Sequence, residues 1–220
     1  MTWVNILCED RTGNGLARVI ESAVQARRAN DKKPSLQIRS GTVAGNTQLL
    51  MQCEKYEFLR YRSRPRHDHI FYVIDAYRIW DLKPAIIEPP PPNQKDDGAY
   101  LERLTAAVCT AMTQRARGTR SENEWQSIAD GFHPHVLVWE RETLMLPVSD
   151  ALGLGEPPRD PRAERHPARW VKQRFQGRSY QKAIHGPQLL ERIASSPDLR
   201  GRVLDATPSL AAIVDELVSL

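Results

Sequence analysis

The sequence is poor in cysteine, in long apolar runs and in anything typical of an export signal. It has only three cysteines, Cys8, Cys53 and Cys109, and none of them forms a CxxC pair. This spacing argues against a disulfide framework or a zinc site, and we expect Cys8 and Cys109 to be small core residues. The N-terminus lacks a basic segment followed by an apolar one, and no run approaches 18 apolar residues. We therefore expect a cytoplasmic protein that does not bind a membrane.

A further absence concerns the N-terminal loop ILCEDRTGNG (6–15). An apolar run leads into a turn with two glycines and then into a helical pattern, as in nucleotide-binding loops. The loop has no lysine, however, and places Glu9 and Asp10 where a phosphate cradle would need backbone N–H groups. Because the chain also contains no Walker motif, any ATP hydrolysis would have to come from a partner.

Positive charge is present in modest excess and is unevenly distributed. The formal net charge is +4, and the stretch Arg159–Arg178 holds seven Arg or Lys residues against two acids. Such a stretch is often no more than a solvated helix face, but phosphate contact is its main functional interpretation. On that interpretation the candidate nucleic-acid-binding residues are Arg169, Lys172, Arg174 and Arg178.

Apolar runs and helical periodicities alternate along the chain. The pattern predicts four strands, at Trp3–Cys8, Leu36–Arg39, Ile70–Ile74 and Val136–Trp139. Between and after them it predicts helices at Gly15–Ala29, from Asn46 or Thr47 to about Arg60, at Tyr100–Ala116, and in short pieces that include Gln188–Ile193 and Leu210–Leu220. This alternation is typical of an α/β fold with a mostly parallel sheet of about four strands, flanked by helices and followed by a helical C-terminal part.

The length of 220 residues suits one α/β domain with a small appendage. We expect the α/β core in residues 1–155 and a basic, helical segment packed on it in residues 156–220. The core carries a proline-rich insertion near 85–97, because the run Pro89–Pro92 is incompatible with regular structure. The sequence does not reveal the role of this run. It also leaves the oligomeric state open, a homo-oligomer included.

Three of the predicted strands are followed directly by an acid, namely Glu9, Asp75 and Glu140. Ligands of open parallel sheets bind beyond the carboxyl ends of the strands, so we expect these acids to converge. Three close carboxylates repel one another, and Mg²⁺ or Mn²⁺ would relieve the repulsion and accept phosphate oxygens as further ligands. The alternative is that each acid is an ordinary turn or capping residue, and that Glu140 pairs with a nearby arginine.

Several segments resemble Toprim domains, the metal-dependent catalytic folds of topoisomerases, primases and the overcoming-lysogenization-defect nucleases. ILCEDRTGNGLARVIESAV resembles the first strand, glutamate and helix of these domains, and FYVIDAY resembles the strand that ends in Asp-x-Asp. Four further pieces resemble a family of small Toprim-like proteins: GTVAGNTQLL, VLVWERETLMLPVSDAL, SYQKAIHGPQLLERI and PSLAAIVDELVSL. The matches occur in the expected order over nearly the whole chain.

The resemblance implies roles for individual residues. Glu9 and Asp75 match catalytic metal-binding acids, Glu140 matches a later metal-binding glutamate, and Lys182 matches a lysine that would donate to phosphate oxygens in the transition state. Lys182 could instead be an ordinary surface lysine, and His185 is better explained as a cap of the next helix than as a phosphate ligand.

The sequence also departs from the family pattern at two acid positions. Gly13 stands where a second glutamate is usual, and Tyr77 replaces the second aspartate of Asp-x-Asp. A tyrosine phenol stays protonated at neutral pH and is a poor Mg²⁺ ligand. Two metal ligands are thus absent, which calls a two-ion mechanism into question.

The resemblance implies a Mg²⁺-dependent nuclease acting on DNA or RNA phosphodiesters. It further implies an ABC/AAA-type ATPase partner and a place in prokaryotic defence against phage. The alternative is a catalytically degenerate scaffold or sensor subunit that binds an ATPase or nucleic acid. A third option is another phosphotransfer or nucleotide-processing reaction, because a fold does not determine a reaction.

Overall fold

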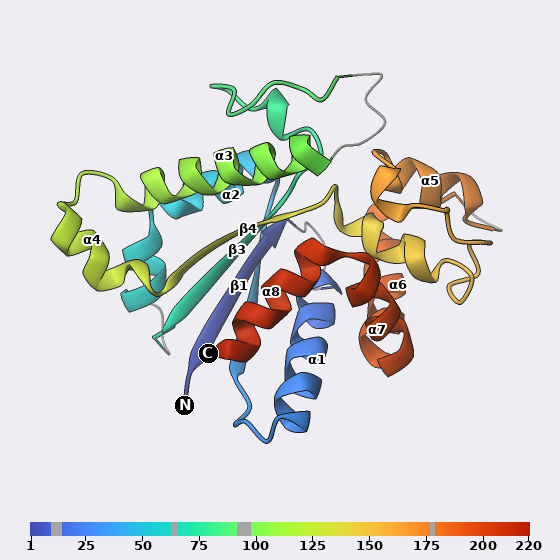
Figure 1. The fold of residues 1–220 in the computed structure, drawn as a ribbon, viewed down its shortest axis with the longest axis horizontal. Coiled ribbons are helices and arrows are strands. Elements are labelled where there is room, and N and C mark those ends of the chain that lie inside the picture. Colours follow the sequence, from blue (N-terminus) through green and yellow to red (C-terminus); the bar gives the residue numbers. More distant parts are fainter. Residues whose placement is uncertain (10–14, 63–65, 92–97, 177–178) are drawn as a thin grey trace. The chain divides into compact units, whose positions relative to one another are not determined.

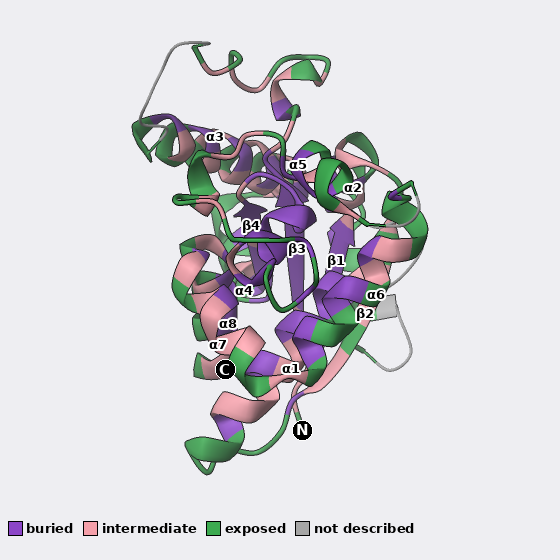
Figure 2. Cartoon of the chain, turned by 90° about the vertical axis from the view of Figure 1, so that its right-hand side faces the viewer, coloured by how far each residue is buried: buried purple, intermediate pink, exposed green. Residues whose placement is uncertain are grey.

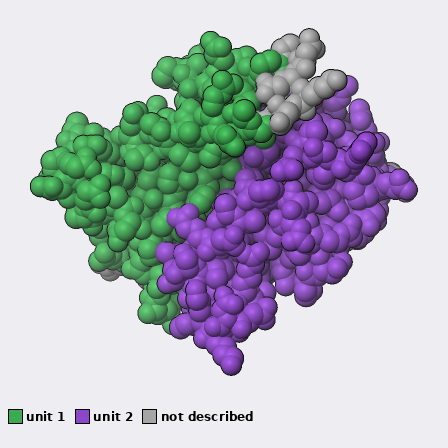
Figure 3. All heavy atoms as spheres, in the orientation of Figure 1, with its two compact units in different colours: residues 1–11, 36–74, 78–136 green, residues 12–35, 75–77, 137–220 purple. Residues whose placement is uncertain are grey.

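The structure, a computed structural model, describes residues 1–9, 15–62, 66–91, 98–176 and 179–220. The chain forms two compact units, which Figure 3 shows in different colours. The first unit comprises residues 1–11, 36–74 and 78–136, and the second comprises residues 12–35, 75–77 and 137–220. These units interleave along the chain, and the expected division into residues 1–155 and 156–220 stays a prediction.

The chain forms a four-stranded parallel sheet with the order β2-β1-β3-β4 (Figure 1). The strands are β1 (Trp3–Glu9), β2 (Gln37–Val43), β3 (His69–Asp75) and β4 (Phe132–Leu137). Strand β1 pairs in parallel with β2 on one side and with β3 on the other. Every residue of β3 after His69 is buried, which suits its continuous apolar run (Figure 2). The predicted α/β fold with a parallel sheet flanked by helices is confirmed, in a layout that matches a Toprim-like one.

Two strands, β2 and β4, differ from the prediction by more than one residue at an end. Strand β2 continues beyond Arg39 to Val43, because residues 40–43 pair with residues 6–9 of β1. Strand β4 begins earlier, at Phe132, and ends at Leu137 rather than Trp139. Beyond it the Trp139 N–H donates to the Thr143 hydroxyl at 3.3 Å, which turns the chain into the next helical segment. The prediction that Glu140 directly follows the strand is therefore wrong, because Val138 and Trp139 lie between them.

Helices α2 (Asn46–Cys53) and α3 (Gly98–Arg117) of the first unit pack against each other, and α2 also packs on β1 and β2. The helix predicted to run to about Arg60 ends at Cys53, and a short π-helical turn, η1 (Phe58–Arg62), follows. The unit also contains the 3₁₀ turn η2 (Ile79–Asp81) and helix α4 (Glu122–Ala129). Helix α4 was not predicted, although Ser121 and Glu124 form a capping box that marks its start.

The second unit is helical, as predicted for the C-terminal part. It contains α1 (Gly15–Asn30), α5 (Pro167–Arg174), α6 (Lys182–Ser195), α7 (Pro197–Ala206) and α8 (Pro208–Ser219), with the 3₁₀ segments η3 (Arg141–Val148) and η4 (Pro161–Ala163). Helix α1 packs on α6 and α8. Buried Arg28 at the end of α1 donates to Leu217 O and Val218 O of α8, at 3.4 and 3.1 Å. None of the helices in the described ranges is long and apolar enough to span a membrane.

The three cysteines lie in the first unit and are free thiols. Cys8 is buried, as predicted, and so is Cys53, whose pKa burial raises to about 12. Cys109 is half-buried rather than a full core residue, and its thiol donates to Pro134 O at 3.3 Å. The Cys53 thiol, which its burial keeps protonated, is a packing group and not a nucleophile.

A pair of glycines provides a direct test of the packing. A Cβ added at Gly131 would lie 2.5 Å from Arg60 Cζ and 2.6 Å from Asp68 O, whereas one added at Gly201 meets nothing within 4 Å. Arg60 has little room to move because it donates to Ile128 O at 2.7 Å. We expect Gly131→Ala to lower the free energy of unfolding by about 1–3 kcal/mol. The control Gly201→Ala, inside α7, should raise it by about 0.5–1 kcal/mol. Urea denaturation checks both, and equal effects of the two variants would contradict this packing.

A histidine pair predicts loss of stability in mild acid. His69 Nδ1 and His133 Nε2 lie 3.0 Å apart, so one ring must be a neutral acceptor. Burial, followed by the charge of His133, lowers the pKa of His69 below its ordinary 6.5, although Asp68 opposes the shift and Arg60 adds to it. The unfolded chain therefore binds a proton more readily than the folded one. The free energy of unfolding should be constant above about pH 7 and fall as the pH drops below about 6.5.

Urea denaturation between pH 5 and 8 measures this dependence. The variant His69→Gln should show a shallower decline than the parent protein, because the titrating ring is gone. Another buried histidine, His67, also has a lowered pKa, for which burial is the main cause. Some acid sensitivity should therefore remain in His69→Gln. An unchanged slope in this variant would show that His69 does not contribute.

Candidate active site in the second unit

A run of charged residues lies in the buried segment that follows β4. Arg141 and Glu142 begin η3, and both are buried together with the four residues after them. Glu140 immediately precedes η3 and is 4% exposed. Buried charges are unfavourable unless they are paired and hydrogen-bonded, so the partners of these side chains determine the structure of this region.

The Glu140 carboxylate links two helices of the second unit. Its Oε1 accepts a hydrogen bond from the Ala168 N–H at 2.9 Å, near the N-terminus of α5. Its Oε2 accepts from the Lys182 ammonium at 2.6 Å, at the first residue of α6. A carboxylate is favourable at a helix N-terminus because it complements the helix dipole. Glu140 thus fixes the N-terminal ends of α5 and α6.

Lys182 is the cation of this group. In addition to Glu140, its Nζ lies 3.0 Å from Glu142 Oε2. An ammonium at a helix N-terminus opposes the helix dipole, so the nearby carboxylates must hold it there. Burial lowers the pKa of Lys182, but the charges of Glu142, Glu140 and Asp75 raise it above its ordinary value on balance. The side chain is nevertheless 44% exposed, and it can therefore meet a ligand from solvent.

Glu142 is the innermost member of the group and is fully buried. Its Oε1 accepts from the Tyr180 hydroxyl at 3.0 Å and from Arg141 Nε at 3.4 Å. Arg141 in turn donates through Nη2 to Lys182 O at 2.8 Å. Burial, together with the Glu142 charge, raises the pKa of Tyr180. The tyrosine therefore stays protonated as the donor to Glu142.

Asp75 ends β3, belongs to the second unit and is 6% exposed. The two residues after it run beside the end of β4: Ala76 N–H donates to Leu137 O at 2.9 Å, and Tyr77 N–H donates to Trp139 O at 2.6 Å. The charge of Asp75 contributes to the raised pKa of Lys182, after the charges of Glu142 and Glu140. We refer to Asp75, Glu140, Glu142 and Lys182 as the acid–lysine cluster.

The structure thus brings together three of the four catalytic or metal-binding residues that the sequence analysis selected: Asp75, Glu140 and Lys182. The fourth, Glu9, is the half-buried last residue of β1 and belongs to the first unit. Its predicted role stays a prediction. Gly13, where the family pattern has an acid, lies outside the described residues. Tyr77, at the other departure, packs edge-on against the His166 ring with a centroid separation of 5.7 Å.

Sequence reasoning missed Glu142, Arg141 and Tyr180. A signal for them exists in the string ERETLML (140–146), where an acid, a base and a second acid precede an apolar run. Charges embedded in a buried segment need one another as partners, and the alternation of sign supplies them. His185 lies inside α6 rather than before it, and its Nδ1 accepts the N–H of Gln181, the residue before the helix, at 2.9 Å.

The predicted nucleic-acid-binding residues lie mainly on α5, which packs on η3 through buried Trp170 and Val171. Arg169, Lys172 and Arg174 are all exposed, and the Arg174 guanidinium lies 4.0 Å from the Trp170 ring centroid. Arg178 falls outside the described residues. The exposed basic face leaves both interpretations of this stretch open, a solvated helix face and a phosphate-binding surface.

The chemistry of the cluster can be compared with the needs of a divalent cation. The described residues contain no group of three or more His, Cys, Asp or Glu arranged to hold a metal ion. Mg²⁺ commonly uses only one or two carboxylates and takes its other ligands from water and substrate phosphates. Asp75 and Glu140 offer such hard oxygen donors, and a carboxylate oxygen that accepts one hydrogen bond retains a second lone pair. The donor set therefore fits Mg²⁺ or Mn²⁺.

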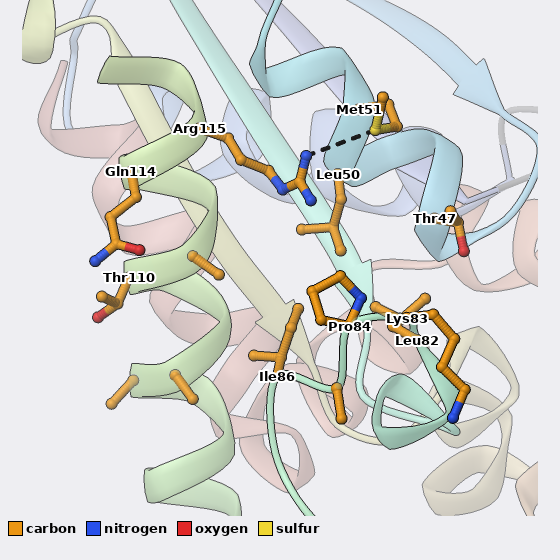
Figure 4. Close-up of a pocket in the computed structure, with 14 residues that line it drawn as sticks. Thr47, Leu50, Met51, Leu82, Lys83, Pro84, Ile86, Thr110, Gln114 and Arg115 are labelled. Atoms are coloured by element: carbon orange, nitrogen blue, oxygen red, sulfur yellow. Dashed lines mark hydrogen bonds between the residues drawn. The ribbon is translucent and has the colours of Figure 1, made fainter. Parts of the chain in front are cut away.

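The first unit has a groove of about 710 Å³ between α2, residues 82–86 and α3 (Figure 4). Small and apolar side chains form most of its lining, and Arg115 extends across it toward Met51 Sδ at 3.6 Å. Arg115 also pairs with Glu54 at 2.5 Å. Of the predicted site residues that the structure describes, none lines this groove.

Comparisons with known proteins add no assignment. Neither the models of known protein families, nor the curated proteins, nor the solved structures contain a match to this chain.

Proposed function

We propose that the protein is a Mg²⁺- or Mn²⁺-dependent phosphodiester hydrolase acting on nucleic acid. The observation that carries the proposal is the convergence of Asp75, Glu140 and Lys182 in one cluster, with the lysine exposed and the acids buried. Phosphoryl chemistry uses such a combination, because carboxylates can hold a cation while an ammonium neutralises phosphate oxygens.

Each residue of the cluster has a distinct task in the proposed reaction. Asp75 and Glu140 would hold the divalent cation, which when bound activates water and offsets charge on the phosphate. Lys182 donates to the non-bridging phosphate oxygens, whose negative charge grows in the transition state. Glu142 is fully enclosed and does not reach a substrate; it positions Lys182 and, with Glu140 and Asp75, keeps it protonated.

The proposed substrate is DNA or RNA, and the exposed Arg169, Lys172 and Arg174 of α5 are proposed to contact its backbone phosphates. We further propose an ABC/AAA-type ATPase partner and a role in prokaryotic anti-phage defence. These two points rest on the resemblance to Toprim nucleases and on the absence of a Walker motif from the sequence.

A cleavage assay tests the proposal. The purified protein, with and without an ATPase encoded beside it, is incubated with labelled DNA and RNA in Mg²⁺, in Mn²⁺ and in EDTA. Cleavage that requires metal and is lost in Asp75→Asn and Glu140→Gln supports the proposal. The variant Glu9→Gln in the same assay tests the predicted role of Glu9. Intact nucleic acid under every condition would refute a hydrolase.

One observation favours the alternative of a catalytically silent scaffold or sensor subunit. Both oxygens of Glu140 already accept hydrogen bonds, from Ala168 and Lys182, so the residue also has a purely structural use. Tyr77 at an expected acid position points in the same direction. A stable complex with an ATPase, combined with failure of every cleavage condition, would support this alternative.

A further inference from the structure

The first unit exposes two aromatic side chains that do not pack in its core. Phe58 is 64% exposed and Tyr61 is 39% exposed, and both belong to the π-helical turn η1. By contrast, Tyr56 just before this turn is fully buried and donates to Ile128 O at 2.8 Å. Single exposed apolar residues are common, but two aromatic rings within one five-residue turn form a surface suited to stacking.

Arginines flank this aromatic pair. The Arg66 and Arg60 guanidinium carbons lie 4.6 and 5.1 Å from the Tyr61 ring centroid. Arg60 is itself buried and fixed by its hydrogen bond to Ile128 O at 2.7 Å, so it holds Tyr61 in place from one side. Arg66 is exposed and can reach a ligand. The ring is therefore pre-oriented beside a cation that is open to solvent.

The charge of this region suits a polyanion. Among the described side chains of residues 55–66, three basic residues, Lys55, Arg60 and Arg66, stand against one acid. The one acid, Glu57, pairs with Arg120 at 2.5 Å and so adds little repulsion. Lys55 is exposed beside the turn. A positive surface next to solvent-exposed rings attracts phosphates while it offers stacking to bases.

We propose that Lys55, Phe58, Tyr61 and Arg66, which we call the aromatic–arginine surface, bind single-stranded nucleic acid. Unpaired bases stack on Phe58 and Tyr61, and Lys55 and Arg66 contact the backbone phosphates. Duplex fits less well, because its bases are already stacked on one another. The proposal rests on the proposed function, since it specifies unpaired nucleic acid as the ligand. Binding at this surface needs neither metal nor cleavage.

The test measures binding in EDTA, where no cleavage occurs. Fluorescence anisotropy is recorded with single-stranded DNA and RNA of about 20 nucleotides, and with the matching duplexes. We expect Phe58→Ala and Tyr61→Ala each to weaken single-strand binding about tenfold. Arg66→Ala should weaken it less and reduce the slope of log affinity against log salt by about 0.7. All three side chains lie at the surface, so the variants should fold.

Matched controls are available in the same unit. Met51→Ala removes a 41% exposed apolar side chain from α2, and Arg103→Ala removes an exposed charge from α3. Neither should change affinity. Wild-type affinity in Phe58→Ala and Tyr61→Ala, or equal binding of duplex, would overturn the proposal. So would sedimentation that shows Phe58→Ala dissociating a dimer, because the surface would then be a protein interface. Since the assay contains no metal, its outcome is independent of whether the protein cleaves nucleic acid.

Discussion

Replacing Lys182 by alanine is expected to lower the rate of metal-dependent cleavage by about two to three orders of magnitude. The ammonium is the exposed cation of the acid–lysine cluster, and its raised pKa keeps it charged at neutral pH. Without it, the charge that develops on the phosphate oxygens loses its protein donor. Single-turnover kinetics at saturating metal measures the effect on the chemical step rather than on binding.

Two further variants separate this role from a general loss of structure. Lys33→Ala removes an exposed lysine of the second unit that donates to Val218 O at 2.9 Å, and it should leave the rate unchanged. Lys182→Arg keeps the positive charge and should retain more activity than Lys182→Ala. If Lys182→Ala folds normally and cleaves within about threefold of wild type, the lysine has no catalytic part.

Removing the Glu142 carboxylate should produce the largest loss of stability of any single substitution in the cluster. Glu142→Ala removes the acceptor of Arg141 Nε and of the Tyr180 hydroxyl, and it takes one of two ion-paired carboxylates from Lys182. Breaking a buried ion pair by removing one partner costs about 3–5 kcal/mol, because an uncompensated charge remains. We therefore expect the free energy of unfolding, measured by urea denaturation, to fall by about that amount.

The same experiment includes graded controls. Tyr180→Phe removes one hydrogen bond to Glu142 and should cost about 1 kcal/mol. Glu156→Ala removes an exposed acid and should change stability by less than about 0.5 kcal/mol. A loss below about 1 kcal/mol in Glu142→Ala would mean that this carboxylate is not the anchor of the cluster.

The fold could be predicted from local pattern because its strands are short apolar runs and its longer helices are amphipathic. The prediction failed where pairing or packing decides the boundary. Strand β2 extends to Val43 through a glycine-containing stretch, because β1 offers partners along that length. Strand β4 ends at Leu137 because the chain turns where Thr143 accepts the Trp139 N–H. No local propensity specifies either event.

The site shows the same division between local and tertiary information. The ends of parallel strands predicted that acids would gather. The resemblance of SYQKAIHGPQLLERI to Toprim-like proteins pointed to Lys182. The sequence could not show that the Lys182 ammonium would lie 2.6 Å from the Glu140 carboxylate. Nor could it show that Glu142 would be the most buried acid of the group, although the alternating charges of ERETLML indicate that it has partners.

The sequence by itself determined an α/β protein with four parallel strands, a helical C-terminal part, and acids placed where strands end. It could do so because hydrophobic periodicity is a local property of a chain, and the succession of strands and helices follows from it. Only the tertiary structure decided which charges meet. Ion pairs between residues 40 or more positions apart, such as Lys182 with Glu140 and Glu142, depend on how η3, α5 and α6 pack. Packing is a property of the assembled unit, in which a buried charge must find its partner or remain unstable.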